Sequence, residues 1–81
     1  MTTVAGALGA AAARLAERHD SARLDAEILL THALGRGRSH LYAWPEAELT
    51  SAQAAAFEAL VERRMAGEPV AYLVGRREFW S

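Results

Sequence analysis

The sequence predicts an all-α fold, a compact bundle of about five helices, three of them longer and two short. Apolar residues recur at helical spacing, and stop signals separate the helical segments; only the last few residues read as a strand. The 81 residues and the formal net charge of −1 are typical of one small domain. Alanine supplies 19 residues, so the 52% hydrophobic content overstates the core.

The first helix is expected from about Thr3 to His19. Its apolar residues recur at spacings of three or four and therefore share one face; they are Val4, Leu8, Ala11 and Leu15. Gly6 and Gly9 weaken the start of this helix, since each interior glycine costs about 1 kcal/mol relative to alanine. The helix therefore needs neighbours to hold it.

A second helix is expected to begin after a Ser21 cap, to continue through Leu34 and to stop at Gly35. Large apolar residues cover more than one of its faces, which predicts a central helix with neighbours on several sides. Its acidic residues, Asp25 and Glu27, are expected to face solvent.

Residues 35–38 are expected to form a loop, after which Ser39 would cap a short third helix from His40 to about Trp44. Pro45 would end this helix, because the residue before a proline avoids helical geometry. Its large side chains, which should supply its apolar contacts, are Leu41, Tyr42 and Trp44.

Thr50 and Gln53 match a capping box and predict a fourth helix that runs to Ala66, where Gly67 supplies a left-handed stop. Its apolar stripe consists of Phe57, Leu60, Val61 and Met65. Pro69 fits the first turn of a short fifth helix that ends at about Val74.

Residues 76–81 read better as the beginning of an extended strand, because they carry two large aromatic side chains and no helical stop. A strand needs a partner strand to be stable. These residues are therefore expected to begin a further structural unit.

Several kinds of chemistry lack the residues that they need. Cysteine is absent, which excludes disulfides, thiolate zinc sites and cysteine nucleophiles. His19, His32 and His40 are separated by 13 and 8 residues, which matches no local metal-ligand spacing, so no metal site is predicted.

The apolar run at residues 4–13 lacks a preceding positive region and is shorter than the roughly 20 residues of a membrane span. A cytoplasmic protein is expected.

The charged residues and glycines predict no active site either. Glu58 and Glu62 lie one helical turn apart, but catalytic carboxylates need burial or a like-charged partner, and these are expected on a solvated face. Gly35 and Gly37 follow a helix rather than a strand, so they do not form a nucleotide-binding loop. The residues alone indicate a helical module without chemistry of its own.

An independent DNA-binding or regulatory module remains an alternative, because the second and third helices superficially resemble a helix-turn-helix. Phosphate contacts could come from residues 35–38, 63–64 and 76–77. The net charge of −1 argues against this alternative, since DNA-binding modules usually carry a clear excess of basic residues.

Two stretches carry a family resemblance that covers essentially the whole chain. Residues 22–35 read ARLDAEILLTHALG, and residues 67–80 read GEPVAYLVGRREFW. The chain resembles the N-terminal helical domain of the peptide-chain release-factor glutamine methyltransferases, the HemK/PrmC family. The second stretch is the more specific, with Gly-Glu-Pro-Val-Ala-Tyr-Leu, a spacer and then Glu-Phe-Trp.

The resemblance implies a parent enzyme in which a β-hairpin linker and a Rossmann-like domain that binds S-adenosylmethionine follow this domain. It implies methylation of the glutamine side-chain amide in the Gly-Gly-Gln loop of class-1 release factors, positioned by an Asn-Pro-Pro-Tyr motif. Neither that motif nor a glycine-rich cofactor loop occurs here. Residues 1–75 are therefore expected to recruit the substrate and residues 76–81 to begin the linker, with no catalytic or cofactor-binding residue in this chain.

The resemblance also implies that the domain holds the release factor beside a distant active site. The candidate contact residues are Arg36, Arg38, Arg63, Arg64, Tyr72, Phe79 and Trp80. The arginines would meet an acidic face of the partner, with solvated surface charge as the alternative. The aromatic residues lie near the exit toward the catalytic domain, so their alternative role is contact with that domain.

Overall fold

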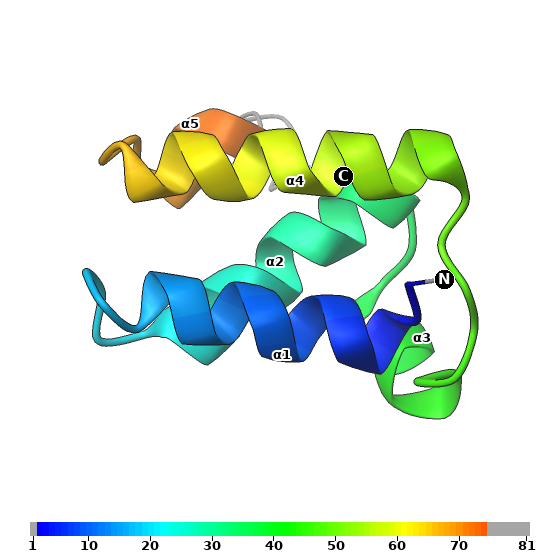
Figure 1. Ribbon diagram of the computed structural model, residues 1–81. Helices are drawn as coiled ribbons and strands as arrows, with labels where there is room; N and C mark the ends of the chain where they lie inside the picture. The colour runs from blue at the N-terminus through cyan, green and yellow to red at the C-terminus, as the bar shows by residue number, and fades with distance from the viewer. Residues whose placement is uncertain (1, 75–81) are drawn as a thin grey trace.

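Five helices account for most of residues 2–74, the part of the chain that the computed structural model describes (Figure 1). They are α1 (Val4–Leu15), α2 (Ala22–Leu34), α3 (Arg38–Ala43), α4 (Ser51–Met65) and α5 (Val70–Val74). The predicted all-α fold, with three longer and two short helices, is confirmed. The prediction of a strand at residues 76–81 lies outside the described residues.

Helix α2 is the centre of the bundle. It lies between α1 and α4 (Figure 1) and packs against all four other helices. Leu29 and Leu30 of α2 and Leu15 of α1 are completely buried, and burial of each leucine side chain contributes about 2 kcal/mol. The predicted central position of the second helix is therefore confirmed, as is the buried apolar face of the first.

Helix α1 is shorter than predicted but is anchored at its beginning. It ends at Leu15 because residues 16–19 turn away in tight hydrogen-bonded turns rather than continue the helix. At its other end, the Thr3 hydroxyl accepts a 3.0 Å hydrogen bond from the backbone N–H of Gly6. The backbone N–H of Val4 also donates to the carbonyl of Ala47, at 2.8 Å. The segment before α4 thus holds the glycine-containing first turn of α1.

The connection from α2 to α3 follows the prediction only in part. Gly35 adopts a left-handed conformation with φ of 69°, as expected for a helix stop. Helix α3, however, begins at Arg38, two residues earlier than predicted, and Gly37 rather than Ser39 occupies the N-cap position in an extended conformation. Ser21 does precede α2, but its side chain makes no capping hydrogen bond.

Helix α4 begins and ends as predicted. The backbone N–H of Gln53 donates to the Thr50 hydroxyl at 3.0 Å, and the backbone N–H of Thr50 donates to Oε1 of Gln53 at 2.9 Å, which completes the capping box. At the other end Gly67 has a φ of 106°, and the next backbone N–H, of Glu68, returns to the carbonyl of Arg63. The chain thereby turns directly into α5.

Candidate functional site

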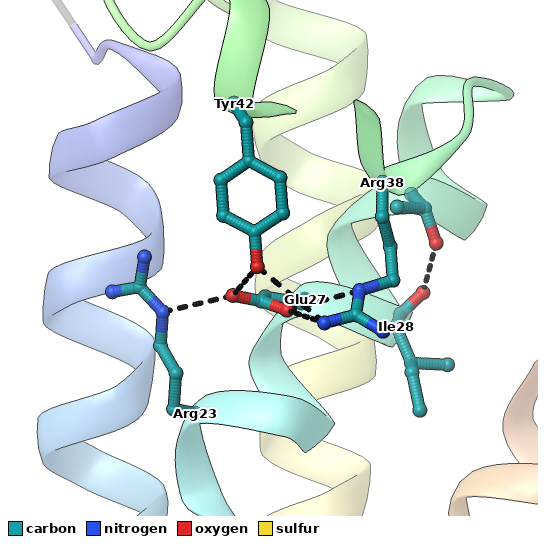
Figure 2. Close-up of polar contacts among 6 residues, drawn as sticks. Arg23, Glu27, Ile28, Arg38 and Tyr42 are labelled. Atoms are coloured by element: carbon teal, nitrogen blue, oxygen red, sulfur yellow. Dashed lines mark hydrogen bonds and ion pairs between the residues drawn. The ribbon is translucent and has the colours of Figure 1, made fainter. Parts of the chain in front are cut away.

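Glu27 lies at the centre of a polar cluster between α2 and α3 (Figure 2), although the residue is only 3% exposed. The Tyr42 hydroxyl donates to its Oε2 at 2.7 Å, and Nε of Arg23 donates to the same oxygen at 3.1 Å. Nε of Arg38 donates to Oε1, also at 3.1 Å. The prediction that Glu27 faces solvent is therefore wrong, because donors from two helices replace the water.

These donors determine the protonation state of Glu27. Burial alone raises the pKa of a carboxyl group, but the hydrogen bonds from Tyr42, Arg23 and Arg38 outweigh it and hold the pKa of Glu27 below its ordinary value of 4.5. The carboxylate is thus charged at neutral pH and accepts hydrogen bonds. A general acid would need a raised pKa instead. The hydrogen bonds of this cluster therefore serve to hold α3 against α2.

Asp25 forms a second buried contact, between α2 and the end of α4. Its Oδ2 accepts a hydrogen bond from Nε of Arg64 at 3.1 Å, and the residue is 7% exposed, so the prediction that Asp25 faces solvent is also wrong. The carbonyl of Arg64 in turn accepts a 3.2 Å hydrogen bond from the ring nitrogen Nε2 of His19. His19 thus contacts the C-terminal end of α4.

The structure separates the predicted arginine contacts into two groups. Arg36 and Arg38 lie beside the start of α3, where the Arg36 side chain is exposed and has no hydrogen-bond partner among residues 2–74. Arg63 and Arg64 lie at the end of α4, and Arg63 makes two hydrogen bonds to the Glu68 carboxylate, at 3.2 and 2.8 Å. Both members of the second group are paired with acidic side chains, and so is Arg38 with Glu27, which leaves Arg36 as the member of the four without such a partner within residues 2–74.

The predicted aromatic contacts are described only in part. Tyr72 on α5 is 69% exposed, the most of any large hydrophobic side chain described. Phe79 and Trp80 lie outside the described residues. The contact role of Tyr72 stays a prediction.

Sequence reasoning missed the exposure of two other aromatic residues. Tyr42 and Trp44 were expected to provide apolar contacts for the third helix, but Leu41 alone is buried there, and the two aromatic side chains are 58% and 60% exposed. Arg23, whose side chain is 59% exposed, was missed as well. The four-residue spacing between Arg38 and Tyr42 places them on one helical face and was the available signal.

A cavity of about 420 Å³ lies between α1 and α4. Small residues of α1 line one wall, and an ion pair of 2.8 Å between Arg14 and Glu58 crosses its rim. Phe57 and Val61 of α4 form much of the apolar opposite wall. The cavity contains no cluster of polar groups that would define a reaction.

Residues 2–74 provide neither a metal site nor a membrane-spanning helix. No three histidine, aspartate or glutamate side chains lie close enough together to hold a metal ion. None of the helices in this part of the chain is long and apolar enough to cross a membrane.

The five helices, with the hydrogen-bonded groups around Glu27 and Asp25, define a small helical domain that exposes arginine and aromatic side chains. The chain belongs to the PrmC N-terminal domain family, whose sequence model matches residues 6–75. This confirms the family predicted from the two sequence stretches.

Curated relatives agree with this assignment. The release factor glutamine methyltransferase of Shewanella oneidensis is 49% identical over 78 residues, which cover 96% of this chain and 27% of that protein. The Vibrio cholerae protein of the same name is 48% identical over 80 residues, covering 98% of this chain and 28% of that protein. The Escherichia coli K12 protein is 53% identical over 62 residues, covering 76% and 22%. The chain thus spans about a quarter of the length of these relatives, and no solved structure matches it.

Proposed function

We propose that this chain is the substrate-recruiting N-terminal domain of a methyltransferase that modifies class-1 peptide-chain release factors in the cytoplasm. The parent enzyme would transfer a methyl group to the side-chain amide nitrogen of the Gly-Gly-Gln glutamine. One observation carries the proposal: relatives named release factor glutamine methyltransferase are about half identical to nearly the whole of this chain. Residues 76–81 would begin the linker to the catalytic domain.

S-adenosylmethionine would supply the methyl group, but residues 2–74 do not fit a site for it. A nucleotide-type cofactor loop is a glycine-rich turn between a strand and a helix. Here the two glycines with positive φ, Gly35 and Gly67, both follow helices, and no strand is present in the described part of the chain. We therefore assign no step of methyl transfer to these residues.

Docking is a physically reasonable task for such a domain. A single glutamine amide offers few groups for recognition, whereas contacts far from the reacting atoms can supply the binding energy that positions it. The exposed arginine and aromatic side chains support this role, since such residues dominate the energetics of protein interfaces.

The proposal can be tested by competition between this chain and a full-length relative for the same release factor. The full-length Escherichia coli relative would methylate a class-1 release factor with increasing amounts of the 81-residue chain added. If the chain docks the release factor, it removes free substrate and raises the apparent KM, while kcat stays unchanged. Undiminished methylation at a large excess of chain over release factor would contradict the proposal, and salt-sensitive DNA binding by the chain would favour the alternative.

A further inference from the structure

Exposed side chains on and beside α3 make up what we call the α3 surface. Arg23, Arg38 and Tyr42 share contacts with Glu27. Arg36 lies in the loop just before α3, and Trp44 directly follows the helix; both are exposed. Helix α3 packs chiefly against α2, and Leu41 is its one buried residue. The outer side of α3 is therefore uncovered by the described residues.

The α3 surface carries an excess of positive charge, although the chain as a whole has a net charge of −1. Arg23 and Arg38 share the single carboxylate of Glu27, which is buried beneath them. Arg36 is exposed and forms no ion pair within residues 2–74, so it adds a further positive charge. The arginines of α1 and α4, by contrast, have acidic partners of their own.

We propose that the α3 surface is where the domain docks the release factor, through an acidic patch on that partner. This inference rests on the proposed function and specifies its surface. Glu27 holds Arg23 and Arg38 in place, so less side-chain entropy is lost when a carboxylate binds their remaining N–H groups (Figure 2). Trp44 and Tyr42 add exposed aromatic area beside them.

A protein partner fits this surface better than a nucleic acid. Binding to a phosphate backbone depends on many basic contacts, and nucleic-acid-binding domains are usually basic as a whole. In this domain the excess of positive charge is confined to a few arginines of the α3 surface, which lie among tyrosine and tryptophan. That combination is characteristic of the residues that dominate protein–protein binding.

Two substitutions test the assignment without disturbing the Glu27 cluster. Arg36→Glu reverses a charge that has no partner among residues 2–74, and Trp44→Ala removes an exposed side chain. Arg18→Glu is the matched control, since Arg18 is also exposed without a side-chain partner in the described part of the chain. Arg18 lies in the turn after the C-terminal end of α1, whereas the segment after α3 lies against the N-terminal end of α1 (Figure 1). Arg18 is therefore at the opposite end of α1 from helix α3.

Calorimetric titration with a class-1 release factor gives the readout, with circular dichroism verifying that each variant is folded. We expect Arg36→Glu and Trp44→Ala each to raise Kd at least about fivefold, with Arg18→Glu within about twofold of wild type. Equal affinities of the wild type and the three variants would contradict the assignment of the α3 surface but leave the proposed docking function intact. Failure of the wild-type chain to bind would contradict both the surface and the docking function.

A single-stranded RNA oligonucleotide provides the second arm of the experiment. We expect the wild-type chain to bind it much more weakly than the release factor. Tight RNA binding that Arg36→Glu abolishes, with unchanged affinity for the release factor, would instead assign the α3 surface to nucleic acid.

Discussion

The hydroxyl group of Tyr42 donates a 2.7 Å hydrogen bond to Oε2 of Glu27, across the contact between α3 and α2. Helix α3 has only six residues, too few to be stable on its own, so it depends on this contact and on the burial of Leu41. The same carboxylate positions Arg23 and Arg38 at the surface. One buried acidic residue thus supports both the fold and the surface proposed to dock the release factor.

Removing the charge of Glu27 should destabilise the domain. We expect Glu27→Gln to lower the free energy of unfolding by about 1–3 kcal/mol, because the hydrogen bonds to a buried carboxylate are weakened or lost. Urea unfolding followed by circular dichroism measures this change. Glu58→Gln is the control, since the Glu58 side chain is 60% exposed, and it should change the stability by at most about 0.5 kcal/mol. Equal effects of the two substitutions would contradict the bracing role of Glu27.

The hydroxyl of Tyr42 can be tested separately from its ring. Tyr42→Phe should cost about 1–2 kcal/mol, because it removes a hydrogen bond to a charged acceptor and keeps the aromatic area. Tyr72→Phe removes a hydroxyl that has no hydrogen-bond partner within residues 2–74 and should leave the stability nearly unchanged. A Tyr42→Phe chain as stable as wild type would show that the 2.7 Å contact contributes nothing.

The lowered pKa of Glu27 predicts a specific pH dependence. Because the folded-state value lies below the ordinary 4.5, the stabilisation is complete above pH 4.5 and is lost as the pH falls through the folded-state pKa. The stability difference between wild type and Glu27→Gln should therefore be constant near neutral pH and shrink in acid. Urea unfolding of both chains across this range measures it, and contributions from other carboxyl groups largely cancel. A difference that stays constant throughout would refute the assignment.

The two N-caps of α2 and α4 predict unequal costs for similar substitutions. Thr50→Ala should lower the free energy of unfolding by about 1 kcal/mol, because it removes half of a complete capping box. Ser21→Ala should cost clearly less, since the Ser21 side chain makes no capping hydrogen bond. Thermal unfolding of the two variants under identical conditions compares them, and a larger effect at Ser21 would contradict the observed caps.

Local sequence patterns predicted the helices, whereas the burial of Glu27 and Asp25 depends on contacts between helices. Thr50 and Gln53 lie three residues apart, and Gly35 acts through its own backbone, so both features were readable from the sequence. Glu27 was misjudged because its partners Arg38 and Tyr42 follow 11 and 15 residues later on another helix.

Core packing and the start of α3 show the same limit. The buried residues of α2 include the small Ala22 and Ala26, whereas Leu24 is 44% exposed, against its hydrophobic character. The start of α3 depends on the extended conformation of Gly37, which no local pattern specified.

Direct binding tests the central claim, that this domain recognises a release factor. The isotopically labelled 81-residue chain would be titrated with the release-factor domain that carries Gly-Gly-Gln, and its amide and indole resonances would be followed by NMR. We expect saturable shifts at micromolar partner, with the indole N–H of Trp44 among the resonances that move most. An unchanged spectrum at high micromolar partner would contradict the claim.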